Sequence, residues 1–184
     1  MTVYRFRRIV IESYPVLLTC VIIGIAAGFL LNASLGRLTP IILAMIPPIN
    51  GLGGNVGSIL GARLTSALHM GTIQPQIRGQ KLLRMNIAAS SLLSVVIFAF
   101  AGSVFFAFAY VSGASLLSSI KLAGAFFAAS MMLVMTVILT TVAAAFISFT
   151  RGIDPDNVVI PIVTSVCDVL GVISLLITIQ ILGV

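Results

Sequence analysis

Acidic side chains are rare in this chain, and three of its four lie close together near the C-terminus. Asp154, Asp156 and Asp168 fall in the segment DPDNVVIPIVTSVCD. Asp168 lies in an apolar run, about 17 Å beyond Asn157 if the run is helical. An ionised carboxylate at that depth in a membrane-length helix is costly unless it faces water, an ion or a partner. A cation path is the favoured interpretation, and a protonated Asp168 bonded to a neighbouring helix is the alternative.

Small and polar residues accompany Asp168 at helical spacing. Three- and four-residue steps connect Asn157, Pro161, Thr164, Asp168 and Gly171, so they share one helix face. Pro161 also frees the backbone carbonyl one turn earlier. Oxygen donors of this kind suit a hard cation such as Mg²⁺, whereas soft metals favour thiolate or imidazole. One carboxylate per chain makes a weak site, so we expect a homodimer with two copies of Asp168 at a shared axis.

A second unusual segment, PPINGLGGNVGS, spans Pro47–Ser58 between apolar stretches. Two prolines and four glycines predict a broken helix whose freed carbonyls and amides, with Asn50 and Asn55, would line a cation path. Irregular backbone at membrane depth is tolerated only where it lines a water-filled cavity or is buried in protein. Tight helix packing through small residues is the alternative interpretation.

The remaining acids have local explanations as well as possible roles in ion entry. Asp154 and Asp156 flank Pro155, which predicts a turn, with Asp156 or Asn157 capping the helix that follows. Two carboxylates at the mouth of a membrane path would also concentrate cations. Glu12 is interpreted as an interfacial residue near Arg8, four residues earlier.

Composition places these residues in an integral membrane protein. The chain has 184 residues, of which 60% are hydrophobic and 8% are charged, and its mean hydropathy is +1.25. Soluble domains are far more polar. We therefore predict a single all-α membrane domain over residues 1–184. Its five spans are predicted at Ile11–Leu31, Pro40–Ser66 (containing the break), Leu83–Val111, Ile120–Phe149 and Asn157–Leu182.

The distribution of basic residues predicts the orientation of these spans. Eight of the ten basic residues lie before the first span or in the second and fourth connections. They are Arg5, Arg7, Arg8, Arg63, Arg78, Lys81, Arg84 and Arg151. Arg37 and Lys121 lie on the other side. Because basic residues favour the cytoplasmic side, we predict a multi-pass protein of the cell membrane with its N-terminus inside and its C-terminus outside.

Two motifs in this order resemble the transmembrane domain of MgtE-type magnesium transporters, and in pattern most of all the eukaryotic solute carriers of that superfamily. The motifs are PPINGLGGNVGSILGARLTSALHMGTI, from Pro47 to Ile73, and PDNVVIPIVTSVCD, ending at Asp168. The likeness covers nearly the whole chain.

The resemblance implies a Mg²⁺ path at a homodimer interface, lined by the second and fifth spans. It implies that Asp168 holds the ion and that Gly53, Gly54 and Asn55 face the pore. It also places Asp154 or Asp156 at the cytoplasmic side. The candidate metal-binding residues are therefore Asp168, Asn55, Gly54, Gly53, Thr164, Asp156, Asp154 and Asn157.

Two departures from the family pattern are informative. Bacterial MgtE proteins carry a large cytosolic sensor before the membrane part, whereas about ten residues precede the first predicted span here. We expect gating by such a sensor to be absent or to come from a separate regulatory chain. The eukaryotic relatives carry two membrane units per chain and this sequence has one, which favours the homodimer.

Two other functions compete with divalent cation transport. One is a proton- or sodium-coupled carrier of another solute, with Asp168 as the coupling site. The other is a non-transporting membrane subunit that docks a partner through the fifth span. An enzyme is not expected, because the single histidine and the lack of a Ser/His/Asp arrangement or phosphate-binding loop leave no catalytic set. The scattered basic residues do not predict nucleic-acid binding either.

Overall fold

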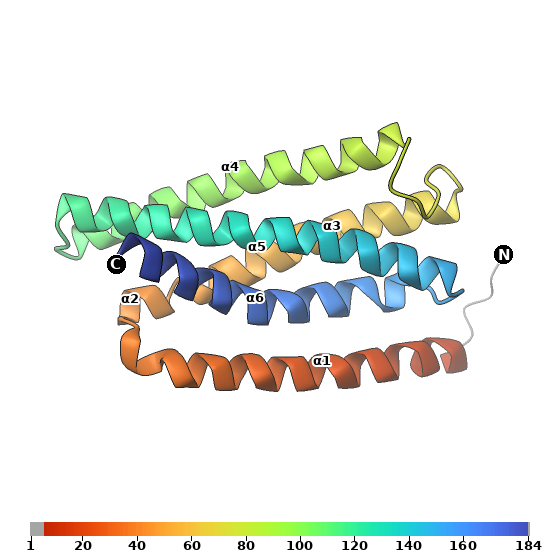
Figure 1. Cartoon of the computed structure of the whole chain (residues 1–184), viewed down its shortest axis with the longest axis horizontal. Helices are drawn as coiled ribbons and strands as arrows, with labels where there is room; N and C mark the ends of the chain where they lie inside the picture. Colours follow the sequence, from red (N-terminus) through yellow and green to blue (C-terminus); the bar gives the residue numbers. More distant parts are fainter. Residues whose placement is uncertain (1–5, 184) are drawn as a thin grey trace.

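A computed structural model describes residues 6–183, without the side chains of Arg8 and Arg37. The described residues contain no strand, which confirms the all-α prediction. Five long helices form the bundle in Figure 1: α1 (Phe6–Ser34), α3 (Ile46–His69), α4 (Lys81–Val111), α5 (Leu116–Thr150) and α6 (Val159–Leu182). Three short helices join them: η1 (Leu35–Arg37), α2 (Pro40–Leu43) and η2 (Pro155–Asn157). The five predicted spans therefore correspond to helices, with bounds that differ by several residues.

Four of the long helices have the length and apolar composition that a membrane crossing requires. They are α1, α4, α5 and the η2–α6 segment. The fifth, α3, is long enough at 24 residues but carries the glycines and asparagines of the central motif. Its lower hydropathy is consistent with a helix that meets protein or water more than lipid.

The predicted position of the helix break is wrong. The chain breaks at Ala44 and Met45, between α2 and α3, and the whole of Pro47–Ser58 is α-helical. Pro47 and Pro48 lie in the first turn of α3, where a missing N–H costs no hydrogen bond within the helix. The next amide already completes the ladder, since Ile49 N donates to Met45 O at 3.1 Å.

The glycines of α3 allow close packing instead of breaking the helix. A Cβ atom added at Gly57 would lie 2.3 Å from Val163 on α6 and 2.7 Å from Val137 on α5. Added Cβ atoms at Gly53 and Gly61, one turn away on either side, would lie 2.8 and 2.7 Å from neighbouring side chains. The alternative interpretation of this segment, helix packing through small residues, therefore describes these three positions.

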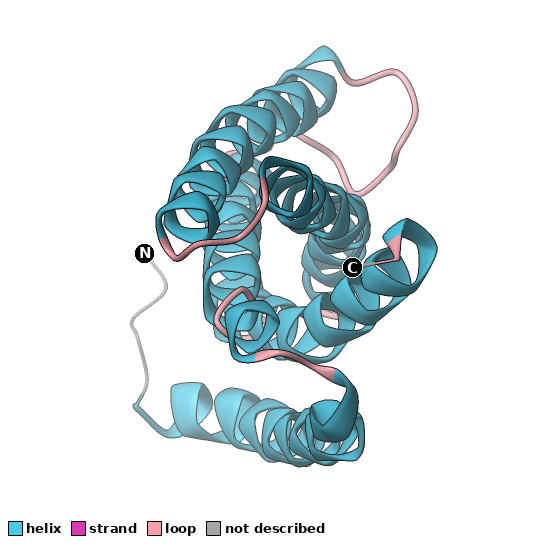
Figure 2. Ribbon diagram, turned by 90° about the vertical axis from the view of Figure 1, so that its left-hand side faces the viewer, coloured by secondary structure: helices cyan, strands magenta, loops and turns pink. Residues whose placement is uncertain are grey.

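The helices differ greatly in how far they are enclosed. In Figures 1 and 2, α5 lies among α3, α4 and α6, while α1 runs along the edge of the bundle beside α6. Only 6% of the α1 span is buried, compared with 44% of the α5 span. Aromatic rings join α4 to α5, where the Phe105 and Phe126 centroids are 4.8 Å apart.

The two ends of the bundle carry different charges. The start of α1, the α3–α4 connection and the α5–α6 connection lie at one end, and the C-terminus lies at the other (Figure 1). Arg78 and Lys81 belong to the first of these connections and Arg151 to the second, whereas Lys121 lies near the start of α5 at the opposite end. Arg5 lies outside the described residues. The basic bias that motivates the predicted orientation is thus preserved among the described residues.

Candidate functional site

Asp168 is the tenth of the 24 residues of α6 and is exposed on the surface of the chain. One side chain from another helix reaches it: Asn50 Nδ2, in the second turn of α3, donates a 3.4 Å hydrogen bond to Asp168 Oδ1. The sequence predicted that Asn50 would supply an oxygen to the cation path. The structure instead uses its amide N–H₂ to hold the carboxylate.

The Asp168 carboxylate sets the orientation of the Asn50 amide, and Gly171 leaves room for the amide oxygen. Asn50 Oδ1 is buried with no hydrogen-bond partner in the described chain, and a Cβ atom added at Gly171 would lie only 1.9 Å from it. The reverse orientation of the amide would place its oxygen against the Asp168 carboxylate, where two acceptors repel each other. Gly171 is therefore buried against α3 and does not share the exposed surface of Asp168, although it was predicted on the same helix face.

Two further predicted residues are exposed on the same two helices. Thr164 lies one turn before Asp168 on α6, and Asn55 lies on α3. The Thr164 hydroxyl donates to Ile160 O and Pro161 O, both at 3.0 Å, so its oxygen lone pairs still face outward. We call the exposed set Asn55, Thr164 and Asp168 the polar strip.

The two glycines of the Gly-Gly-Asn motif have different neighbours. A Cβ atom added at Gly54 would lie 3.4 Å from Thr164 Cγ2, so Gly54 brings α3 close to α6 beneath the polar strip. Gly53 is directed toward Leu133 on α5 and Cys167 on α6. Gly53 is thus a packing residue within the chain, whereas Asn55 carries the exposed amide of the motif.

The α5–α6 connection holds the other predicted residues, of which the nearest, Asn157, lies about 17 Å from Asp168 at 1.5 Å per helical residue. Asp154 Oδ1 accepts from Asp156 N at 3.1 Å and so caps η2. The capping prediction named Asp156 or Asn157 and is wrong; α6 itself begins after Val158 with no side-chain cap. Asp156 is exposed, and Asp154 and Asn157 are half-buried.

Glu12 on α1 reaches this connection, which the sequence did not reveal. Its Oε2 accepts from Asn157 Nδ2 at 3.0 Å and from Asp154 N at 3.3 Å. The partners are 145 and 142 residues away along the chain, so no local spacing could have indicated them. The side chain of the predicted neighbour, Arg8, lies outside the described part of the chain, so that prediction stays untested.

One chain alone offers a modest set of metal ligands. Within residues 6–183 no group of three His, Cys, Asp or Glu side chains lies close enough to hold an ion. The polar strip provides one carboxylate, one amide and one hydroxyl. Such a set suits outer-shell contact with a hydrated cation, because Mg²⁺ gives up its water reluctantly and is usually held by few carboxylates.

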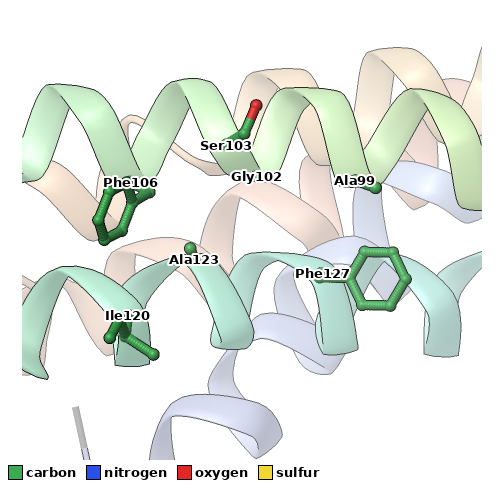
Figure 3. Close-up of a pocket in the computed structure, with 7 residues that line it drawn as sticks. All are labelled: Ala99, Gly102, Ser103, Phe106, Ile120, Ala123 and Phe127. Atoms are coloured by element: carbon green, nitrogen blue, oxygen red, sulfur yellow. The ribbon is translucent and has the colours of Figure 1, made fainter.

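The hollow in Figure 3 is unrelated to this surface. It lies between α4 and α5 and is almost wholly apolar. The hydroxyl of Ser103 points away from α5 in that view and donates to Phe100 O at 2.7 Å. Its lining residues are Ala99, Gly102, Ser103, Phe106, Ile120, Ala123 and Phe127. The hollow offers no ligand for a cation.

The fold and the polar strip together define a multi-pass helical membrane protein with one carboxylate exposed halfway along a spanning helix. The chain belongs to the MgtE divalent cation transporter family, whose family model matches residues 46–178. The match includes α3, α4, α5 and nearly all of α6, and therefore both motifs and every predicted site residue. No curated protein and no solved structure matched the chain.

Proposed function

We propose that this chain transports divalent cations, with Mg²⁺ as the principal ion, along a path lined by α3 and α6. The supporting observation is the position of Asp168. It is exposed near the middle of α6, where it is the only charged side chain, and Thr164 on α6 and Asn55 on α3 are exposed as well. A carboxylate on lipid would be costly, so this surface must face water, an ion or protein.

A homodimer satisfies this requirement. The polar strip points away from the interior of its own chain, and α3 is too polar to serve as an ordinary lipid-facing span. A second copy packed against α3 and α6 would shield both strips from lipid. It would also bring two Asp168 carboxylates to one axis, with the oxygens of Asn55 and Thr164 nearby.

The chemistry of the strip favours hard cations. Asp168, Asn55 and Thr164 present oxygen ligands, whereas Cys167, the nearest thiol in sequence, is buried. Mg²⁺ would pass as a largely hydrated ion held through its water shell. Asp154 and Asp156 would concentrate cations at the mouth of the path. Gly54 would hold the two lining helices together at the strip.

We further propose that the end of the bundle with Arg78, Lys81 and Arg151 lies in the cytoplasm of a cell whose plasma membrane holds the protein. That arrangement places the start of α1 and both acids of the α5–α6 connection inside, and the C-terminus outside. Anionic lipid head groups would neutralise the exposed basic side chains.

Mg²⁺ uptake into proteoliposomes tests the function directly. The full chain would be compared with Asp168→Asn and Asp168→Ala, and with Asn86→Ala as a control on α4, where the Asn86 amide donates to Leu82 O within the helix. We expect uptake by the unmodified chain and by the control, and loss of most uptake in both Asp168 variants. Cobalt(III) hexaammine, an inert mimic of hydrated Mg²⁺, should inhibit it.

Each other result would favour a different function. Equal uptake in all variants would remove Asp168 from the path. Loss of gradient-driven accumulation with intact downhill exchange in Asp168→Asn would indicate a proton- or sodium-coupled carrier. No uptake by the unmodified chain would contradict the proposal and favour a non-transporting subunit.

A further inference from the structure

Helix α1 is the least buried of the four candidate membrane spans. It packs against α6 along one side and touches η2. The family match begins at residue 46, so α1 lies outside the matched region.

The most specific of these contacts is made by Glu12. A single oxygen, Oε2, accepts from Asn157 Nδ2 at 3.0 Å and from Asp154 N at 3.3 Å. One donor is a side chain and the other is backbone, so the contact fixes both the position of the connection and its conformation. Hydrogen bonds to a charged acceptor are stronger than neutral ones.

The connection held by Glu12 is a compact, ordered turn. Asp154 caps η2 by accepting from Asp156 N, and Asn157 N donates to Asp154 O at 3.1 Å. Pro155 is buried within it. Because η2 leads through Val158 directly into α6, any movement of this turn moves the start of the helix that carries Asp168.

We propose that Glu12 is a positioning residue that ties α1 to the mouth of the ion path. Through this tether, α1 holds Asp154 and Asp156 where they collect cations and holds the start of α6 in register. This consequence for transport rests on the proposed function, whereas the tether itself does not. A shift of α1 along α6 would loosen the mouth, so α1 is the element through which the path can be regulated from outside the matched domain.

Three substitutions at Glu12 separate reach from charge. Glu12→Gln keeps an acceptor oxygen at the same reach and removes the charge. Glu12→Asp keeps the charge and shortens the side chain by one methylene, and Glu12→Ala removes both. Thr19→Ala is the control, because Thr19 is exposed on the same helix and its hydroxyl donates to Pro15 O within α1.

Hydrogen–deuterium exchange of the full chain in lipid nanodiscs would measure the tether without reference to transport. We expect peptides covering residues 150–158 to exchange roughly tenfold faster in Glu12→Ala and Glu12→Asp, as expected when one hydrogen-bonded unit is lost. Thr19→Ala should match the unmodified chain, and Glu12→Gln should fall between it and Glu12→Ala, because a neutral oxygen still accepts both hydrogen bonds but holds them less strongly. Unchanged exchange in Glu12→Ala would overturn the tether, and so would equally fast exchange in Thr19→Ala.

Mg²⁺ uptake by the same variants then tests the consequence for transport. We expect the half-saturating Mg²⁺ concentration to rise by roughly threefold in Glu12→Ala and Glu12→Asp, with maximal uptake retained, because the mouth no longer concentrates cations. Faster exchange with unchanged uptake would overturn the positioning role. If the unmodified chain shows no uptake, the proposed function fails, while the exchange result still decides whether the tether exists.

Discussion

The Asp168 carboxylate is oriented by a neighbour that contributes no ligand of its own. Asn50 donates to one carboxylate oxygen, and Gly171 leaves the room that the Asn50 amide needs. Asp168 is nevertheless exposed, so a hydrated cation or a second chain could reach its carboxylate. Asn50 thus acts on the ion through Asp168.

Replacing Asn50 by Ala should therefore weaken ion binding without closing the path. A typical intramolecular hydrogen bond contributes about 0.5–1.5 kcal/mol, so we expect the half-saturating Mg²⁺ concentration to rise by roughly two- to tenfold. Maximal uptake should change little. Concentration-dependent uptake into proteoliposomes measures both quantities, with Asn86→Ala as the matched control. An unaltered half-saturating concentration would show that Asp168 does not depend on Asn50.

Gly171→Ala should also weaken Mg²⁺ binding, because it displaces the Asn50 amide. The added methyl group would collide with Asn50 Oδ1, so the amide must leave Asp168 or α3 must move away from α6. Combining Gly171→Ala with Asn50→Ala removes the collision, and the double variant should bind Mg²⁺ no more weakly than Asn50→Ala alone. Additive losses would contradict this coupling.

Polar residues inside apolar runs were easier to single out from the sequence than the partners they contact. Asp168, Thr164 and Asn55 are exposed, whereas Gly53 and Gly54 are buried, and the role of all five in holding an ion stays a prediction. The partners of Asp168 and Glu12 are 118 and 145 residues away from them, and helical spacing carries no information at that range. Long-range pairs of this kind depend on how helices are packed, which a single sequence does not specify.

Among the elements, the five long helices were predictable, their bounds only to within several residues, and the break was not. Apolar runs long enough to span a membrane indicate each helix but not its exact ends. The prediction of a break within Pro47–Ser58 was wrong because both prolines lie in the first turn of α3. A proline there is harmless, whereas a proline further along a helix disrupts it. The chain breaks just before these prolines, at Ala44 and Met45, which places them at the start of a helix. The glycine content of the segment could not have shown this, because glycines occur both in broken helices and in closely packed ones.

The packing role of the α3 glycines can be tested at Gly57. We expect Gly57→Ala to destabilise the folded protein by about 1–3 kcal/mol, because its Cβ would meet Val163 and Val137 at distances that side chains cannot occupy. Gly124→Ala on α5 is the control, since a Cβ there meets nothing within 4 Å and alanine favours helix. Thermal unfolding in detergent, followed by circular dichroism, compares the two. Equal stability of both variants would mean that α3 is not packed as described.

On the scale of the whole molecule, the charge difference between the two ends predicts orientation. We expect a cysteine at Gln76, in the α3–α4 connection, to be protected from a membrane-impermeant maleimide applied to intact cells. A cysteine at Ser112, in the α4–α5 connection at the opposite end, should react. The chain without an introduced cysteine gives the background from Cys20 and Cys167. The reverse labelling pattern would place the N-terminus outside.

The outward direction of the polar strip has a consequence for assembly. If two copies meet through α3 and α6, a cysteine at Thr164 lies near its counterpart, and mild oxidation in the membrane should give a covalent dimer. A cysteine at Ser103, exposed on α4 beside the apolar hollow, is the control and should stay monomeric. Bound Mg²⁺ should slow the reaction at position 164, because a hydrated ion between the strips holds the helices apart.

A chain that transports Mg²⁺ but does not form this dimer would require the path to run through one protomer. In that case α3 and α6 would have to separate at Gly54, where they now lie in contact.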